Sequence, residues 1–256
     1  MPVAGPLKPP GGALAGGLHA RVLERMGSAI ADGALAEGSV LQIEELEERY
    51  AVSRSVVREA VRVLASMGLV AMRRRIGVQI LPTSEWNVYD PQVIRWRLDS
   101  SGRFAQLRSL TELRTAVEPE AARLAALRAP QERAAEILAL AGELWAAGQD
   151  TDGERFLQLD IEFHRLVLAA SGNEMFTALY PLVEEVLAGR THHGLMPERP
   201  HAEALEQHMN VAVAIQRSDP DAAHDAMLAL MSRTMSEVSE RFGALGGPSA
   251  EKTEGR

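Results

Sequence analysis

Three ionisable residues in the C-terminal part of the sequence have the types and spacing of a metal site. Asp160 and His164 are four residues apart, so both side chains would project from one face of a helix. His208 lies on the apolar stripe of another predicted helix, where an ionisable group is costly unless it is paired or bound to a metal. Two ligands one turn apart and a third from elsewhere can converge on a divalent ion such as zinc. Taken singly, each residue could instead be a hydrogen-bonded core histidine or a solvated aspartate, and the spacing leaves both interpretations open.

A row of arginines nearer the N-terminus has the spacing of a DNA-reading helix. Arg54, Arg58 and Arg62 recur every four residues. Another face of the same predicted helix carries apolar residues at four- and three-residue spacing, namely Val57, Val61 and Leu64. A helix in the major groove of DNA needs this division, with guanidinium groups towards guanine edges or phosphates. The alternative interpretation is a solvated basic face beside an unrelated arginine-rich turn.

The distribution of charge favours a small DNA-binding module on an otherwise acidic protein. The 256 residues carry a formal net charge of -8. Residues 1–85 contain 10 Lys or Arg against 9 Asp or Glu, whereas residues 86–256 contain 17 against 26. Residues 53–75 hold six arginines and one acidic residue. This pattern is expected where one module meets phosphates and the remainder has another task.

Composition excludes several classes of protein. Because there is no cysteine, disulfides, cysteine-ligated metal sites and thiol nucleophiles are excluded. The apolar content of 46% is typical of a folded globular protein. No apolar run approaches the ~18 residues of a membrane span, and the N-terminus lacks the pattern of a secretory signal. We therefore expect a cytoplasmic protein without a membrane partner.

Helix and turn signals over residues 17–82 predict a winged helix-turn-helix. Three helices are expected, and Ser53 is a suitable N-cap for the third, which ends before Gly68. Two extended runs flank a basic turn that contains glycine, which predicts a hairpin. The helices are expected at 19–31, 43–50 and 53–67, and the extended runs at 69–72 and 78–81. Residues 1–16, rich in Gly, Pro and Ala, are expected to form a disordered tail.

The remainder of the chain is helical by pattern. Residues 83–101 are expected to form a linker and a linker helix, and residues 102–245 a bundle of six or seven helices with an internal cavity. A second disordered tail is expected over residues 246–256. Turn residues separate helical segments at 91–98, 102–129, 131–147, 152–171, 174–188, 201–218 and 220–242. The fold class is therefore mainly α, with a winged helix-turn-helix followed by an all-helical domain.

The N-terminal motifs resemble those of a known family. The element Val-Ser-Arg-x-x-Val-Arg-Glu-Ala over residues 52–60 and the wing glycine are similar to the DNA-binding domain of the GntR family of bacterial transcription regulators. The resemblance implies DNA contacts from Arg54, Ser55, Arg58, Arg73, Arg74, Arg75 and Gly77. Many members also have a DNA-contacting arginine at the start of the second helix. Residues 42–45 read Gln-Ile-Glu-Glu here, so we expect no such contact.

The C-terminal part resembles the FCD effector-binding domain of the FadR subfamily over most of residues 105–240. The similar segments are 112–119, 160–164, 171–173 and 206–208. In many such domains an arginine at the position of Arg114 receives the carboxylate of the effector, and a bidentate guanidinium suits that task. Glu118, one turn later, could orient Arg114, bind a hydroxyl of the effector or form an ordinary surface pair. His192 is a further candidate for effector contact at the mouth of the cavity.

The same resemblance implies a metal. In many FCD domains one Asp and three His hold a metal beneath the cavity, which assigns Asp160, His164 and His208 as ligands of a divalent ion. Leu230 stands where the third histidine is expected. The set therefore either holds the metal with three protein ligands or has become a purely hydrogen-bonding site.

The predicted linker points to one branch of the family. Residues 85–96, which include two tryptophans, resemble the same stretch of the galactonate operon repressor branch, whose members also tend to lack the last histidine. This resemblance implies a sugar acid, such as an aldonate, as effector. The tryptophans could equally serve to lock the domains together.

These observations predict a sequence-specific transcription regulator and not an enzyme. The expected protein is a homodimeric repressor on a palindromic DNA operator, released by a small carboxylate. One alternative is a metal-dependent helical enzyme acting on a small organic acid, which leaves the basic footprint unexplained and lacks the common catalytic motifs. The other is an acyl-chain-responsive regulator, which would need a more apolar cavity without Arg114 and Asp160.

Overall fold

In the computed structural model, the described residues are 17–150, 153–194 and 200–244, and the chain divides into two compact units. The first unit ends at Val88 and the second begins at Tyr89, inside the stretch that we predicted to be the linker. Both tails that we expected to be disordered, 1–16 and 246–256, lie outside the described residues. None of the helices in these three ranges combines the length and apolarity needed to cross a membrane.

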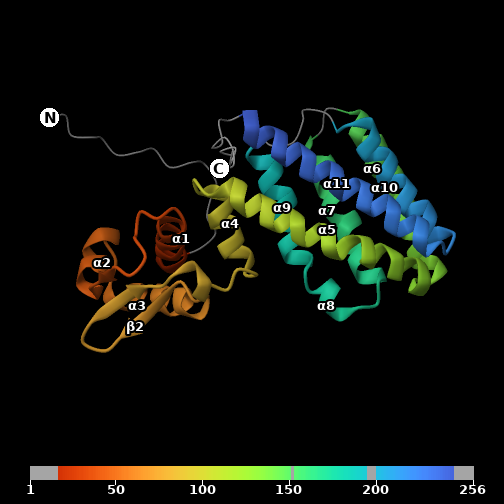
Figure 1. Ribbon diagram of the computed structural model, residues 1–256. Helices are drawn as coiled ribbons and strands as arrows, with labels where there is room; N and C mark the ends of the chain where they lie inside the picture. Colours follow the sequence, from red (N-terminus) through yellow and green to blue (C-terminus); the bar gives the residue numbers. More distant parts are fainter. Residues whose placement is uncertain (1–16, 151–152, 195–199, 245–256) are drawn as a thin grey trace, which may run out of the picture. The chain divides into compact units, whose positions relative to one another are not determined.

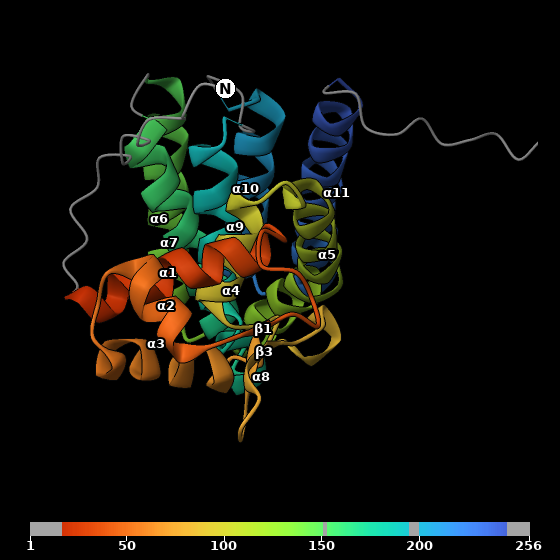
Figure 2. The same cartoon turned by 90° about the vertical axis from the view of Figure 1, so that its left-hand side faces the viewer.

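The first unit consists of three helices and a small antiparallel sheet (Figure 1). Its elements are α1 (Leu18–Ala31), β1 (Val40–Leu41), α2 (Ile43–Tyr50), α3 (Arg54–Ser66), β2 (Val70–Arg73) and β3 (Gly77–Ile80). The strand order is β1-β3-β2, with β1 beside β3 (Figure 2). The winged helix-turn-helix is thus confirmed. The strand β1 was not predicted, because two residues are too few to show the alternation of a strand.

Helix α3 buries one face and exposes the other. Val57, Val61 and Leu64 are fully buried, as their spacing predicted, and so is Ala60. They belong to the core between α3 and α1, to which α1 contributes the fully buried Met26. Complete burial of a large apolar side chain is worth about 1.5–3 kcal/mol. This face therefore fixes the rotation of α3 and leaves its arginines at the surface.

Two glycines determine the path of the chain around the hairpin. Gly68, directly after α3, has a φ of 78°, and a Cβ there would lie 2.1 Å from the carbonyl oxygen of Glu85. Gly77, at the start of β3, has a φ of 128°, and a Cβ there would lie 2.6 Å from the carbonyl oxygen of Leu41. Only glycine tolerates both this backbone conformation and so close an approach. Gly77 is therefore required for β1 to pair beside the wing.

The second unit is all helical in the part that the structure describes. Its helices are α4 (Pro91–Asp99), α5 (Arg103–Arg128), α6 (Gln131–Gln149), α7 (Gly153–Ala170), α8 (Glu174–Thr177), α9 (Tyr180–His192), α10 (Ala202–Gln216) and α11 (Pro220–Ala244). The prediction of a single helix at 174–188 was wrong, since α8 and α9 are separate. Pro181 lies in the first turn of α9, where its missing N–H is tolerated, whereas its ring would clash with the backbone of a continuous helix.

The long helices α5 and α11 lie side by side, and α6, α7 and α10 pack with them around the main core (Figure 1). Fully buried residues at its centre include Phe163 of α7, Val211 of α10 and Met227 of α11. Helix α9 packs against α7 and α4. Inward-facing residues of α5, α7, α9, α10 and α11 can therefore meet inside this unit.

Candidate functional site

The arginines of α3 lie at the surface of the first unit. Arg54, Arg58 and Arg62 are all exposed. The Nη1 atom of Arg54 lies 2.6 Å from Oε1 of Glu44, and the Nη1 atom of Arg62 lies 2.8 Å from Oε2 of Glu59. Among the residues that the structure describes, none forms an ion pair with Arg58. Exposed ion pairs contribute little to stability, so a phosphate oxygen can take the place of either carboxylate.

The two serines at the start of α3 contact each other. Ser53 occupies the N-cap position, as predicted, but its hydroxyl forms no hydrogen bond to the backbone of the helix. Its Oγ lies 2.9 Å from Oγ of Ser55 instead. The predicted N-cap position is therefore confirmed, although the hydroxyl of Ser53 pairs with another side chain and not with the backbone of the helix. Ser55 is exposed in the same turn as Arg54 and Arg58.

The wing presents three exposed arginines, Arg73, Arg74 and Arg75, at the turn between β2 and β3. The Nε2 atom of Gln42 donates a hydrogen bond of 2.7 Å to the carbonyl oxygen of Ile76. Gln42 directly precedes α2, in the segment from which we expected no DNA contact. Its side chain therefore holds the tip of the wing.

A pocket of about 40 Å³ lies inside the second unit, between α5, α7, α9, α10 and α11. Its ionisable lining residues are Arg114, Asp160, His164, Arg190, His201, His208, Arg233 and Glu237. A space of this size has room for only a few water molecules. The pocket lies in the domain where we expected an internal cavity, and the predicted metal ligands line it.

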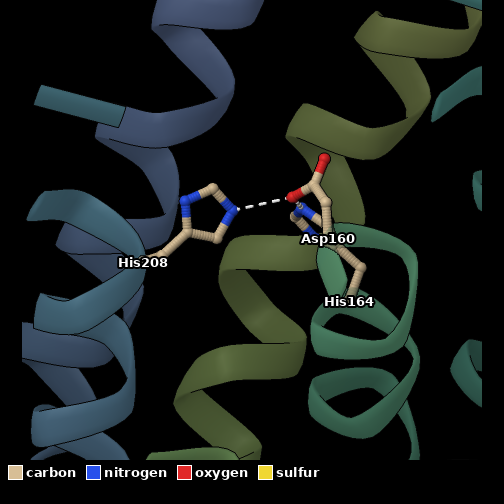
Figure 3. A group of neighbouring side chains, drawn as sticks. All are labelled: Asp160, His164 and His208. Atoms are coloured by element: carbon tan, nitrogen blue, oxygen red, sulfur yellow. Dashed lines mark hydrogen bonds and ion pairs between the residues drawn. The ribbon is translucent and has the colours of Figure 1, made fainter. Parts of the chain in front are cut away.

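Asp160 and His164 of α7 and His208 of α10 come together at this pocket (Figure 3). The Oδ1 atom of Asp160 lies 3.0 Å from Nε2 of His208 and 3.6 Å from Nε2 of His164. One possible ligand atom from each of the three residues lies within 4.8 Å of the others. Burial alone would raise the pKa of Asp160, but hydrogen bonds and charges from both histidines outweigh it and hold the pKa well below its usual range. Asp160 is therefore an anion at neutral pH.

The orientation of the two histidines suits a divalent metal. The Nδ1 atom of His208 lies 2.7 Å from the carbonyl oxygen of Ala204, which can only accept, so this nitrogen carries a proton. The Nδ1 atom of His164 lies 2.5 Å from Oε2 of Glu118. With Nδ1 of each ring engaged in this way, both Nε2 atoms are left on the side of Asp160, as is usual for metal-binding histidines. Two imidazole nitrogens and one carboxylate oxygen fit zinc or a similar ion.

Arg114 and Glu118 form a buried ion pair on α5. The Nε atom of Arg114 lies 2.5 Å from Oε1 of Glu118, and its Nη2 atom lies 3.4 Å from Oε2. The Nη2 atom also lies 3.3 Å from Nε2 of His164. Burial would raise the pKa of Glu118, but the charges of Arg114 and His164 lower it to about 2. Burial and the charge of Arg114 lower the pKa of His164, but the charge of Glu118 and hydrogen bonds to Asp160 and Glu118 together outweigh them, so the pKa of His164 is raised.

The burial of Glu118 excludes one of the three roles that the sequence left open for it, an ordinary surface pair with Arg114. Its side chain is only 2% exposed and that of Arg114 only 1%, so the two do not form a surface pair.

Leu230, at the position of the expected third histidine, is also buried and lines the pocket. It offers no ligand atom to a metal.

Sequence reasoning missed Arg190 of α9. This side chain is buried and lines the pocket, with its Nη2 atom 2.9 Å from Oε2 of Glu237. The Oε1 atom of Glu237 lies 3.2 Å from Nε of Arg233, also at the pocket. The spacing of Val183, Val186 and Arg190 is that of one helix face, and this signal could have identified Arg190 as an inward-facing charge.

His192 is not among the residues that line this pocket, so the structure gives no support to the prediction that it contacts an effector there. It lines a separate groove of about 300 Å³ between α4 and α9, together with Arg95 and Asp99. Residues two apart on a helix point about 200° from each other. Because Arg190 faces the pocket, His192 is turned away from it.

Both units of the chain match known protein families. Residues 18–80 match the model of the bacterial regulatory proteins, gntR family, and residues 109–233 match the FCD domain. The galactonate operon transcriptional repressor of Escherichia coli (strain K12) is 31% identical over 224 residues, which cover 86% of this chain and 96% of that protein. The uncharacterized HTH-type transcriptional regulator YieP of the same strain is 31% identical over 209 residues, which cover 81% and 90%.

Solved structures share the fold. The structure of Lar, which controls the expression of the Listeria monocytogenes agr system, covers 88% of this chain and 98% of its own with a TM-score of 0.55. The two sequences are 14% identical, so this likeness concerns the fold alone.

Each of the two matched domains contains one of the two candidate sites. The gntR match contains the exposed arginines of α3 and the wing, and the FCD match contains Asp160, His164 and His208. These families and relatives are transcription regulators and not enzymes, so the enzyme alternative is not supported. The chain belongs to the GntR family of bacterial regulatory proteins, as a DNA-binding transcription regulator with a C-terminal FCD domain.

Proposed function

We propose that this regulator is a repressor that binds a palindromic operator as a homodimer and is released when a small carboxylate, such as a sugar acid, enters the FCD domain. The observation that carries the proposal is the presence of two different cationic sites, exposed arginines in the first unit and buried arginines at the pocket of the second. The name of the galactonate operon repressor supports both repression and the sugar-acid class.

In this proposal each domain has the role that we predicted from the sequence. Residues 17–82 bind DNA, residues 83–101 link the domains, and residues 102–245 bind the effector and the second protomer. The effector must favour one state of the dimer over another, because otherwise it could not change the affinity for DNA. Since its partner is bacterial DNA, we place its action in the cytoplasm.

On the DNA side, α3 reads bases and the wing holds the backbone. We assign base contacts to Arg54, Ser55 and Arg58, and phosphate contacts to the arginines at residues 73–75. Gly77 gives the wing the close turn that brings these arginines together. Arginine contacts to guanine provide sequence preference, whereas phosphate contacts make the affinity fall as salt rises.

On the effector side, the charges of the pocket favour a small anion over an acyl chain. Arg114, Arg190 and Arg233 line it, against the carboxylates of Asp160 and Glu237. A six-carbon acid is larger than a space of about 40 Å³, so the pocket must widen to admit it. The side chain of Arg233 is 30% exposed and can move aside at the least cost. Glu118 orients Arg114 and neutralises part of its charge.

We infer that Asp160, His164 and His208 hold a divalent metal, zinc or a similar ion, beneath the effector. When bound, the metal would supply a Lewis-acidic centre for an oxygen atom of the acid. Glu118 and the carbonyl oxygen of Ala204 hold the two imidazole rings in place. Elemental analysis after chelation and reconstitution should find stoichiometric metal in the wild type and none in Asp160→Ala. Equal metal content in the two proteins would contradict the assignment.

A gel-shift assay on the promoter of the protein's own gene tests the proposal as a whole. The full-length protein should retard this DNA, and one of a panel of sugar acids should release it. The same acid should stabilise the protein in a thermal-shift assay, by about 2.7 kcal/mol at a hundred times its dissociation constant. Absence of retardation would contradict DNA binding at this promoter, and retardation that no acid relieves would contradict the effector class.

A further inference from the structure

Two buried guanidinium groups at the pocket have donor atoms that no protein group accepts. In the described part of the chain, Nη1 of Arg114 and Nε of Arg190 are buried without a hydrogen-bond partner. The two residues are 2% and 3% exposed, and both line the pocket. A buried donor without an acceptor is costly, so such groups in native proteins usually face water, an ion or a ligand.

Arg114 by itself cannot hold a carboxylate through two parallel hydrogen bonds. Its Nε and Nη2 atoms face Glu118, and Nη2 also lies beside His164. Only Nη1 remains for another acceptor. The role that the resemblance implies for Arg114 therefore needs a donor from a second residue.

Arg190 has such a donor. Its Nη2 atom is held by Glu237 at 2.9 Å, and its Nε atom has no partner. Both guanidinium groups line the same pocket, and after burial the positive charge of Arg114 is the next cause that lowers the pKa of Arg190, because the two cations repel each other. An anion that accepts from both groups would offset this repulsion and satisfy both donors.

We propose that Arg190 is a second effector-binding residue, and that the carboxylate of a small acid accepts hydrogen bonds from Nη1 of Arg114 and Nε of Arg190 together. Glu237 positions Arg190 for this contact through Nη2. The inference rests on the proposed function and extends it, because it assigns the acidic end of the ligand to this pair of arginines. Neutral polyols of the same size should bind more weakly, since they bring no negative charge to offset the repulsion between the two guanidinium groups.

Calorimetric titration of the full-length protein tests this assignment. The probes are D-galactonate, D-gluconate and the neutral polyol galactitol, and the proteins are the wild type, Arg190→Gln, Arg190→Lys and Arg123→Gln. At least one acid should bind the wild type, and galactitol should bind it more weakly. Arg190→Gln should weaken binding of that acid roughly ten- to a hundredfold, as expected for the loss of a charge-assisted hydrogen bond. Arg190→Lys keeps the charge but loses Nε, so it should lie between the two.

Arg123→Gln is the matched control, because Arg123 is paired with Glu120 at the surface of α5 and does not line the pocket. It should bind the acid as the wild type does, and all variants should retain the gel shift. If Arg190→Gln binds the acid as tightly as the wild type, the inference is wrong and the proposed function stands. If Arg190→Gln does not fold, unchanged affinity in Arg190→Lys overturns the inference. If neither acid binds the wild type, the sugar-acid proposal and this inference both fail.

Discussion

The arginines of the first unit and those of the pocket differ in burial and in what holds them. On α3, 56% of the Arg54 side chain is exposed, and its partner Glu44 is exposed as well. In the pocket, the paired side chains of Arg114 and Glu118 are at most 2% exposed. An exposed pair exchanges its partner easily, whereas removal of one member of a buried pair leaves an uncompensated charge. The same residue type therefore suits an exchangeable contact to DNA in one unit and a fixed contact to a small ligand in the other.

The largest expected effect comes from breaking the buried pair. Replacement of Arg114 by Met leaves the buried charge of Glu118 with His164 alone as partner, and should lower the free energy of unfolding by about 3–5 kcal/mol in chemical denaturation. The double variant Arg114→Met with Glu118→Leu should recover most of this loss, because the carboxylate that lost its arginine is removed as well. Neither protein should respond to a sugar acid. If Arg114→Met alone is as stable as the wild type, the buried pair of Arg114 and Glu118 matters no more for stability than an exposed pair does.

A smaller effect is expected at Arg58, to which we assign a base contact. Arg58→Ala should weaken binding to the operator by about 1–3 kcal/mol and relax the preference at one base pair, as measured by gel shift on a set of operator variants. The stability of the protein should not change, since this side chain is exposed. Arg108→Ala, at an exposed arginine of α5, is the control and should bind DNA normally. Loss of affinity without any change of preference would place Arg58 at a phosphate.

Arg74 in the wing should show a weaker and more uniform effect. Arg74→Ala should lower the affinity for all DNA sequences alike. The slope of log affinity against log salt concentration should decrease by about 1, as expected for the loss of one phosphate contact. Titrations at several salt concentrations, on operator and on unrelated DNA, measure this. An effect confined to the operator would argue for base recognition by the wing.

The smallest effect should follow removal of an exposed partner. Glu44→Gln leaves Arg54 with only the longer contact of 4.0 Å to Glu47 and removes one negative charge near the exposed arginines of α3, so DNA binding should tighten slightly while the midpoint of thermal unfolding stays unchanged. Glu48→Gln makes the same change of charge at another exposed position of α2 and controls for net charge. If the two variants tighten binding equally, Glu44 does not compete with phosphate for Arg54.

Local patterns were sufficient for most of the helices and for the face of α3. Val57, Val61 and Leu64 are four and three residues apart, and a helix with this spacing has one obvious buried side. The break between α8 and α9 was missed although Pro181 marks it, because the apolar pattern continues across the break. Strand β1 depends on pairing with β3, a partner far away in the chain, and no local signal encodes that pairing.

The residue types and their short-range spacing were enough to identify a winged helix-turn-helix, an arginine row on one helix face and an Asp–His pair one turn apart on α7. Only the packing of five helices decided that His208 meets this pair, that Glu118 is buried against Arg114, and that α9 turns Arg190 into the pocket and His192 away from it. The reason is physical. Spacing within one helix defines its faces, but which face meets which neighbour depends on the rotation and position of each helix in the core, and these are set by contacts between residues distant in the chain.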